Sequence, residues 1–148
     1  MSQNTAGTFE KLIKGKLIDS KGRPILQKPI NFGKLKKLYT SVDANFIYDS
    51  TLYYVEVNTY NVPKPLIGQY ILLNQLFDKV NEESLKKYTL SNTKLVLITK
   101  AATLNRFTII KYLDFVNKKF FKGNGLKYIV IEYDDTTFCS DLLFESLK

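Results

Sequence analysis

The chain has 148 residues, of which 45% are hydrophobic and 24% charged, values typical of one globular domain, residues 1–148, with its own core. It contains no histidine and a single cysteine, Cys139. This excludes Ser-His-Asp and Cys-His catalysis and an internal disulfide, and it argues against a zinc site. Any enzyme built on this chain has to use carboxylates, lysines, tyrosines or a hard metal ion that prefers oxygen ligands.

The formal net charge is +8, and most of it lies in residues 1–37, where nine basic side chains stand against Glu10 and Asp19. Such a basic N-terminal segment fits a polyanionic partner, because lysines that replace condensed counterions attract a protein to nucleic acid. A solvated lysine face that only keeps the protein soluble fits the same charge. The residues expected to contact nucleic acid are Lys11, Lys14, Lys16, Lys21, Arg23, Lys34, Lys36 and Lys37.

The composition also bears on location. No stretch approaches 18 consecutive apolar residues, so no membrane span is expected. The first residues, MSQNTAGTFEKL, lack the basic start and apolar core of a secretory signal. With one cysteine, we expect an intracellular protein in a reducing compartment, the cytoplasm or the nucleoid or nucleus.

The first half of the chain predicts one helix and two or three strands. Residues 8–18 place apolar side chains on one helical side, although Gly15 weakens the pattern. Residues 19–34 contain two glycines and two prolines, which favour irregular or short extended chain. A first strand is possible over residues 35–40. Residues 44–48 and 52–59 are rich in β-branched and aromatic side chains, which predicts two strands joined by a turn at residues 49–51.

The second half predicts alternating helices and strands. Helices are expected over residues 66–80 and 106–121, the second with Ile109, Leu113, Val116 and Phe120 on its apolar side. Continuous apolar runs predict interior strands at residues 94–99 and 127–133, and residues 138–147 predict a short final helix. The sequence therefore predicts an α/β fold of three αβα layers with a mixed central sheet, in the order α-β-β-β-α-β-α-β.

Two acids frame the predicted hairpin: Asp43 opens its first strand and Glu56 lies near the end of its second. Alternation along the strand puts Glu56 and Asn58 on one face, and the turn brings Asp43 back beside them. Together with the backbone carbonyl of Val57, the two carboxylates can form an oxygen-rich site suited to Mg²⁺ or Mn²⁺. The alternative is an ordinary hairpin with two surface acids. Such an ion lowers the pKa of a bound water and neutralises charge on a phosphate.

This pattern resembles the PD-(D/E)xK nuclease superfamily, whose core runs helix-β-β-β-helix-β with D…E-x-K on consecutive strands. The resemblance covers residues 8–133 in element order and about 16 residues in motif. Asp43 and Glu56 stand at the family's acidic positions. Asn58 stands where the family usually has lysine, and it is expected to help orient the attacking water. The segment YYVEVNTY is similar to the E-x-N form in GATC-cutting restriction enzymes. The resemblance implies a restriction-endonuclease-like domain that hydrolyses DNA endonucleolytically with Mg²⁺, like restriction enzymes or junction resolvases.

Further residues are candidates for the same site. The resemblance suggests Lys64 as the source of the missing charge, Gln69 as a site-facing amide and Glu10 as an additional metal ligand. Each also fits an ordinary surface role. Tyr53, Tyr54, Tyr60 and Tyr70 are candidates to stack on bases, or are packing residues.

Asn58 keeps a second function open, a catalytically inactive nuclease-fold subunit that binds nucleic acid or scaffolds a larger complex. A protein-interaction domain is a third alternative. DNA is the expected partner, RNA stays open, and the small size suits a homodimer or a subunit of a larger assembly.

Overall fold

The computed structural model describes residues 11, 13, 15–34, 37–58, 61–100, 104–133 and 139–147, without the side chains of residues 34 and 37–39. Its centre is a four-stranded sheet in the order β3-β4-β5-β6. The strands are β3 (Ala44–Tyr48), β4 (Thr51–Asn58), β5 (Thr93–Lys100) and β6 (Lys127–Tyr133). β3 is antiparallel to β4, and β4, β5 and β6 are parallel to one another. The predicted mixed sheet is therefore confirmed.

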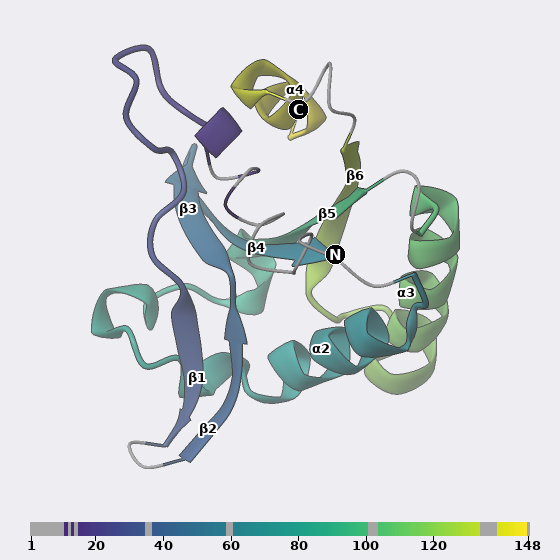
Figure 1. The fold of residues 1–148 in the computed structure, drawn as a ribbon. Coiled ribbons are helices and arrows are strands. Elements are labelled where there is room, and N and C mark those ends of the chain that lie inside the picture. The colour runs from purple at the N-terminus through teal and green to yellow at the C-terminus, as the bar shows by residue number, and fades with distance from the viewer. Residues whose placement is uncertain are drawn as a thin grey trace, which may run out of the picture.

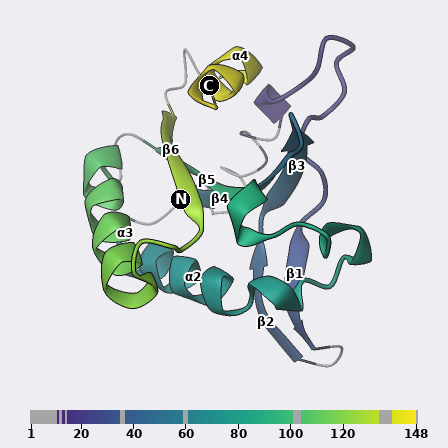
Figure 2. The same cartoon turned by 180° about the vertical axis from the view of Figure 1, so that it is seen from behind.

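Helices cover both faces of the sheet, which gives the predicted three-layer αβα arrangement. Helices α2 (Lys64–Gln75) and α3 (Arg106–Phe121) lie on one face, and α4 (Ser140–Ser146) lies on the other (Figure 1). The view from behind shows the same layers (Figure 2). Short 3-10 turns at Phe77–Lys79, Glu83–Leu85 and Leu90–Asn92 lead from α2 to β5.

Each face of the sheet has its own buried core, because successive strand side chains alternate between the faces. Tyr54 and Leu97 pack on the α2 and α3 side. Val55 and Ile98 pack on the α4 side, together with Ile13 from the N-terminal segment. β4 and β5 are buried on both faces, which explains why their sequences are almost continuously apolar.

The turn between β3 and β4 is tight. Asp49 and Ser50 both have positive φ, 51° and 62°. Two successive residues with positive φ are the mark of a type I′ turn, whose twist matches that of two antiparallel strands. The turn therefore fixes the register in which Ala44 lies opposite Val55.

A second hairpin lies outside the central sheet and corrects the expectation for residues 19–40. β1 (Ile30–Lys34) pairs with β2 (Lys37–Val42), so one short extended piece of residues 19–34 is a strand. The possible first strand at residues 35–40 belongs to this hairpin and not to the main sheet. The register shifts between Phe32 and Gly33, where φ is 140°. This bulge interrupts the alternation of side chains. Together with Pro29 and Gly33, it explains why the sequence pattern does not indicate a strand here.

The helices follow the sequence closely, with differences in their bounds. Of the helix expected over residues 8–18, residues 8–10, 12 and 14 lie outside the described residues, and residues 11, 13, 15 and 16 are helical. α4 covers Ser140–Ser146 of the expected 138–147. α3 has the predicted bounds. Its start is capped by Asn105, whose side chain accepts the N–H of Phe107, and Lys122 and Gly123 end it with positive φ. α2 ends at Gln75 rather than at residue 80, because Leu76 leaves the helical region with φ of −106° and a 3-10 turn follows.

Candidate active site at the start of β3 and the end of β4

Asp43 and Glu56 lie side by side at the point where β3 begins and β4 approaches its end. Asp43 Oδ2 accepts the backbone N–H of Val57 at 2.8 Å, and Glu56 Oε1 accepts the backbone N–H of Asp43 at 3.2 Å. Both side chains are half-buried. Each acid therefore holds the backbone next to the other. Asp43, which directly precedes β3, is thus fixed beside Glu56 of β4, as the sequence predicted.

The backbone of Val57 adds a third oxygen on the same edge of β4. Within a strand, the N–H and C=O of one residue point to the same neighbouring strand. Since the Val57 N–H points to Asp43, the Val57 carbonyl is directed to the same side. Asp43, Glu56 and this carbonyl are oxygen donors of the kind that Mg²⁺ binds, and a Mg²⁺ site commonly uses only one or two carboxylates and completes its shell with water.

Within the part of the chain that is described, the side-chain ligands of such a site are those two acids. There, no three acidic or cysteine side chains gather closely enough to hold a metal ion. Glu10, the additional ligand suggested by the resemblance, lies outside the described residues. The donor set thus fits a weakly held, water-rich Mg²⁺ or Mn²⁺ rather than a permanently caged structural ion.

Asn58 is buried, with 1% of its surface exposed. Its side-chain amide donates to Thr99 Oγ1 at 3.0 Å, and the Thr99 hydroxyl donates to the Leu104 carbonyl at 3.3 Å. Asn58 is therefore the first member of a short chain of hydrogen bonds that crosses from β4 to β5 and on toward α3. This arrangement favours a bracing role, and a role in orienting water stays a prediction.

Gln69 and Lys64, both on α2, differ in their surroundings. The Gln69 amide donates to the Ser41 carbonyl at 2.7 Å, and its oxygen accepts the Thr40 hydroxyl at 2.5 Å. Gln69 thereby ties α2 to the last residues of β2, shortly before Asp43. Lys64 is the exposed first residue of α2.

The tyrosines proposed for base stacking are packing residues where they are described. Tyr53, Tyr54 and Tyr70 are between 0% and 4% exposed. Burial raises the pKa of Tyr53 and Tyr54, and it raises the pKa of Tyr70 to about 12. Tyr60 lies outside the described residues.

Exposed aromatic side chains are found on α3 instead. Phe120, predicted to face the core, is 63% exposed, whereas Ile109, Leu113 and Val116 are buried as predicted. Phe107 and Phe115 are also exposed, at 69% and 62%. The sequence indicated the exposure of Phe107 and Phe115, because their spacing places them outside the apolar side of α3.

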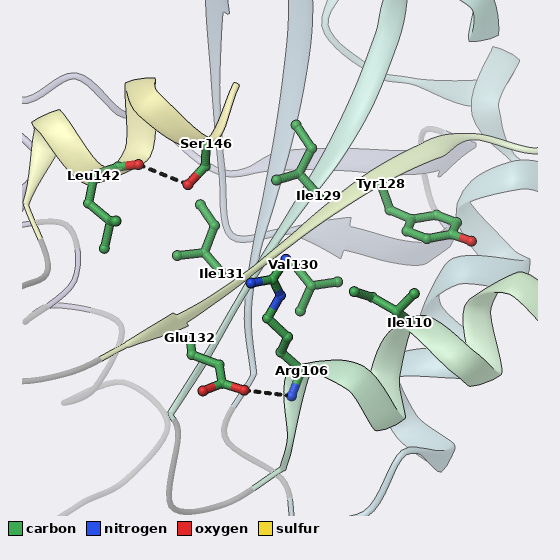
Figure 3. A pocket seen from close by; sticks show the side chains of 9 residues that line it. All are labelled: Arg106, Ile110, Tyr128, Ile129, Val130, Ile131, Glu132, Leu142 and Ser146. Carbon is green, nitrogen blue, oxygen red and sulfur yellow. Dashed lines mark hydrogen bonds between the residues drawn. The ribbon is translucent and has the colours of Figure 1, made fainter. Parts of the chain in front are cut away.

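A pocket of about 510 Å³ lies away from the two acids, between β6, α3 and α4 (Figure 3). Its lining includes Arg106, Glu132 and Leu142 but neither Asp43 nor Glu56. The pocket is therefore separate from the candidate metal site.

The basic residues of the N-terminal segment are spread over separate parts of the fold. Lys11, Lys21 and Arg23 are exposed, whereas Lys16 is half-buried with its ammonium 5.4 Å from the centre of the Tyr133 ring. Lys34 and Lys37 pair through their backbones at the end of the β1-β2 hairpin. Lys14 and Lys36 lie outside the described residues. The hairpin end and the loop at residues 19–23 are thus two distinct basic segments.

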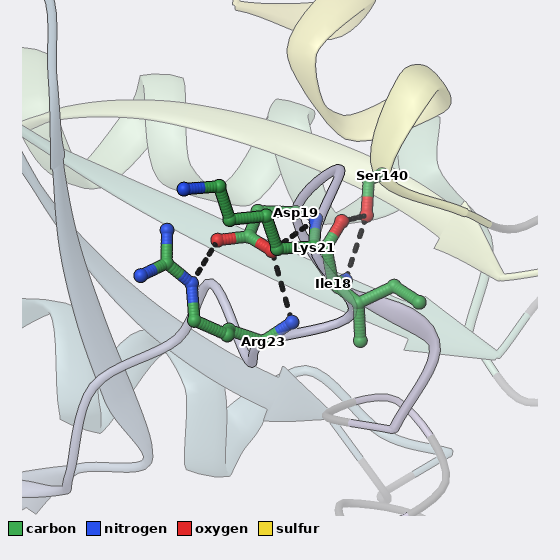
Figure 4. Close-up of polar contacts among 5 residues, drawn as sticks. All are labelled: Ile18, Asp19, Lys21, Arg23 and Ser140. Carbon is green, nitrogen blue, oxygen red and sulfur yellow. Dashed lines mark hydrogen bonds and ion pairs between the residues drawn. The ribbon is translucent and has the colours of Figure 1, made fainter.

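Within that loop, Asp19 holds its basic neighbours in place. Asp19 Oδ1 accepts the backbone N–H groups of Lys21 and Arg23, and Asp19 Oδ2 accepts the Arg23 guanidinium at 2.8 Å (Figure 4). The hydrogen bonds from Arg23 and Lys21 lower the pKa of Asp19. Ser140 bonds both the N–H and the carbonyl of Ile18, which docks the segment on α4. The charge of Arg23 is therefore already partly neutralised.

None of the helices in the described residues is long and apolar enough to cross a membrane. Comparisons with protein-family models, with characterised proteins and with solved structures find no match to this chain.

Proposed function

We propose that this protein is a Mg²⁺- or Mn²⁺-dependent nuclease that hydrolyses DNA phosphodiester bonds, most simply as an endonuclease. The observation that carries the proposal is the pairing of Asp43 with Glu56 through reciprocal hydrogen bonds to each other's strand. Two anchored carboxylates next to a strand-end carbonyl are a suitable ligand set for a hard divalent cation.

In this proposal Asp43 and Glu56 bind the ion, and the Val57 carbonyl completes the protein part of the shell. A bound Mg²⁺ supplies a more acidic water and neutralises charge on the phosphate. Because both acids also accept backbone N–H groups, the site is preorganised before metal arrives. Gln69 acts as a positioning residue, since it fixes the strand that leads into Asp43.

The positive charge near the attacking water has to come from outside position 58. Lys64 is exposed at the start of α2, the helix that follows β4, and carries the proposed role. Lys34 and Lys37 at the hairpin end, together with Lys21, are proposed to bind the phosphate backbone, which is a sequence-independent contribution to affinity. RNA offers the same phosphates, so the cleavage test includes both nucleic acids.

The test uses Asp43→Asn and Glu56→Gln, which keep an oxygen that accepts the backbone N–H but remove the charge that a metal needs. We expect each variant to fold and to lose cleavage of supercoiled plasmid in Mg²⁺ or Mn²⁺. Binding of Mn²⁺, followed by electron paramagnetic resonance, is expected to weaken in parallel. Asp78→Asn is the matched control, because Asp78 is an exposed acid outside the site.

Unchanged cleavage by both variants overturns the metal site, even if the protein proves to be a nuclease. Cleavage lost without a change in Mn²⁺ binding also contradicts the assignment of these acids as ligands.

A second candidate function is a nuclease-fold subunit that binds nucleic acid without cutting it. The burial of Asn58 and its hydrogen bond to Thr99 favour this alternative, because the amide supplies no positive charge at the position of the family's lysine. It predicts salt-sensitive binding of DNA or RNA, no turnover and no measurable Mn²⁺ binding. The Mn²⁺ measurement on the unmodified protein therefore separates the two functions.

A further inference from the structure

β6 is an edge strand of the central sheet, and a groove runs along its outer edge. Five consecutive residues, 128–132, line this groove. The side chains of consecutive strand residues point to opposite faces of the sheet. Five consecutive residues can therefore line one groove only if that groove follows the edge of the strand. Arg106 and Ile110 of α3 form one wall, and Leu142 and Ser146 of α4 form the other (Figure 3). Among the described residues, the two helices thus leave the edge of β6 accessible.

The opposite edge of the sheet is treated differently. At β3, the Asn45 carbonyl accepts the N–H of Gln27 at 2.7 Å, and the Asn45 amide donates to the Lys28 carbonyl at 2.8 Å. The chain itself therefore covers part of that edge. β6 contains no proline or glycine, and its pairing with β5 shows no register shift. Within the described part of the chain, no backbone hydrogen bond of this kind covers the outer edge of β6, and an edge strand left open in this way pairs readily with another strand.

The register of the sheet determines which backbone groups of β6 face outward. N–H and C=O groups of successive residues alternate between the two neighbours of a strand. Val57 directs its N–H toward Asp43 on the β3 side, so the backbone N–H and C=O of Glu56 point toward β5. In a parallel pair, a residue bonds to the two residues that flank its register partner. Glu56 is in register with Leu97, so the backbone N–H and C=O of Leu97 point away from β4, toward β6. Leu97 is in turn in register with Val130, so by the same rule the backbone N–H and C=O of Val130 point outward, into the groove.

Tyr128 and Glu132 share the orientation of Val130, because they are two residues away along the strand. We propose that the groove receives β6 of a second copy of this chain, antiparallel to the first, about a twofold axis at Val130. Val130 then exchanges both backbone bonds with Val130 of the second copy, and Tyr128 does so with Glu132 of the second copy. Every outward backbone group from residue 128 to residue 132 gains a partner, and one sheet runs through both molecules.

The side chains support this register. On the α4 face, Ile129 lies opposite Ile131 of the second copy, an apolar cross-strand pair. On the α3 face, Arg106 donates its backbone N–H to Glu132 Oε1 at 2.9 Å, and the Tyr128 hydroxyl bonds to Asp114. Since the twofold axis puts Tyr128 of the second copy opposite Glu132, it brings Asp114 of the second copy toward Arg106. This pairing of opposite charges occurs twice in the symmetric dimer.

The test measures the dissociation constant of the dimer by sedimentation equilibrium, up to millimolar protein, against the 17.1 kDa monomer. We expect the unmodified protein to dimerise. Arg106→Asp puts like charges opposite each other twice and is expected to raise the dissociation constant by about a hundredfold, because each close charge pair is worth about tenfold or more. Asp114→Arg is expected to do the same. The combined Arg106→Asp/Asp114→Arg variant exchanges the charges and is expected to restore dimerisation.

Arg106→Asp puts an acid in the first turn of α3, which stabilises a helix, so the variant is expected to fold. Circular dichroism checks this directly. Lys111→Asp is the control: it makes the same charge change on the same helix, about 140° around the axis from Arg106. A protein that stays monomeric at all concentrations overturns the proposal. So does a dimer that Arg106→Asp leaves intact, or one that the combined variant fails to restore.

Discussion

The side-chain amide of Asn58 donates a hydrogen bond to Thr99 Oγ1 at 3.0 Å, although the two residues are 41 positions apart in the chain. They lie in register on the parallel strands β4 and β5, and both are buried. The residue that departs from the nuclease pattern thus has a structural task, which can be measured apart from any activity.

We expect Asn58→Ala to lower the free energy of unfolding by about 1–3 kcal/mol, because it removes a buried hydrogen bond and leaves a polar group behind. Urea unfolding followed by circular dichroism measures this value. Asn61→Ala, at an exposed position soon after β4, is the control and is expected to change stability by about 0.5 kcal/mol or less. Equal effects of the two substitutions would contradict the bracing role of Asn58.

Gly125 lies where α2, α3 and the start of β6 meet. A Cβ atom there would come within 2.6 Å of Asn117 Oδ1, 2.7 Å of the Tyr70 hydroxyl and 3.1 Å of Asn74 Oδ1. These oxygens are all engaged: Asn117 accepts the Gly125 N–H, Tyr70 donates to the Leu126 carbonyl, and Asn74 accepts the Leu126 N–H. We expect Gly125→Ala to destabilise the protein by about 1–3 kcal/mol, as overpacking does.

Gly68, inside α2, is the matched control, since a Cβ atom added there would meet nothing within 4 Å and the residue is exposed. Gly68→Ala is expected to stabilise the protein by about 0.5–1 kcal/mol, because alanine restricts the unfolded chain and favours the helix. Thermal unfolding of both variants checks the opposite signs. A Gly125→Ala protein as stable as the unmodified one would show that the three oxygens move aside at little cost.

The buried tyrosines predict a loss of stability in alkali. Burial raises the pKa of Tyr70 to about 12, above its value of about 10 in an unfolded chain. The folded state therefore keeps a proton that the unfolded state loses, so this contribution is fully present below pH about 10 and is lost as the pH rises toward about 12. The midpoint of urea unfolding should fall across this window.

Tyr70→Phe is expected to make the urea midpoint decrease less over this pH range, since phenylalanine does not titrate. Tyr53 and Tyr54, whose pKa values burial also raises, contribute to the fall in the same direction. A midpoint that stays constant above pH about 10 would contradict the burial of these hydroxyl groups.

The end of the β1-β2 hairpin is expected to bind nucleic acid if the proposed function is correct. Lys34→Ala combined with Lys37→Ala should weaken DNA binding at every sequence and reduce the salt slope by about one for each phosphate that the variant no longer binds. Fluorescence anisotropy over a series of salt concentrations measures both quantities. Arg23→Ala is the control, because Arg23 is paired with Asp19, and its effect should be smaller. The reverse order of effects would place the nucleic acid on the loop at residues 19–23.

The sequence alone determined the elements whose signals are local. α3 and β6 have the predicted bounds, and the β3 strand and the turn after it lie where expected, because helical spacing, apolar runs and turn residues act over a few neighbouring positions. The nearness of Asp43 to Glu56 also followed from the sequence, since a tight turn and strict alternation carry two strand residues to one place.

Only the tertiary structure decided the features that depend on distant pairings. It joined β1 to β2 outside the sheet, buried Asn58 against Thr99, and turned the Phe120 side chain outward. It also left β6 at the edge of the sheet, although its sequence is as apolar as that of an interior strand. Strand order, and with it which backbone groups stay open, is set by contacts between segments far apart in the chain, and composition or spacing within one segment carries no record of them.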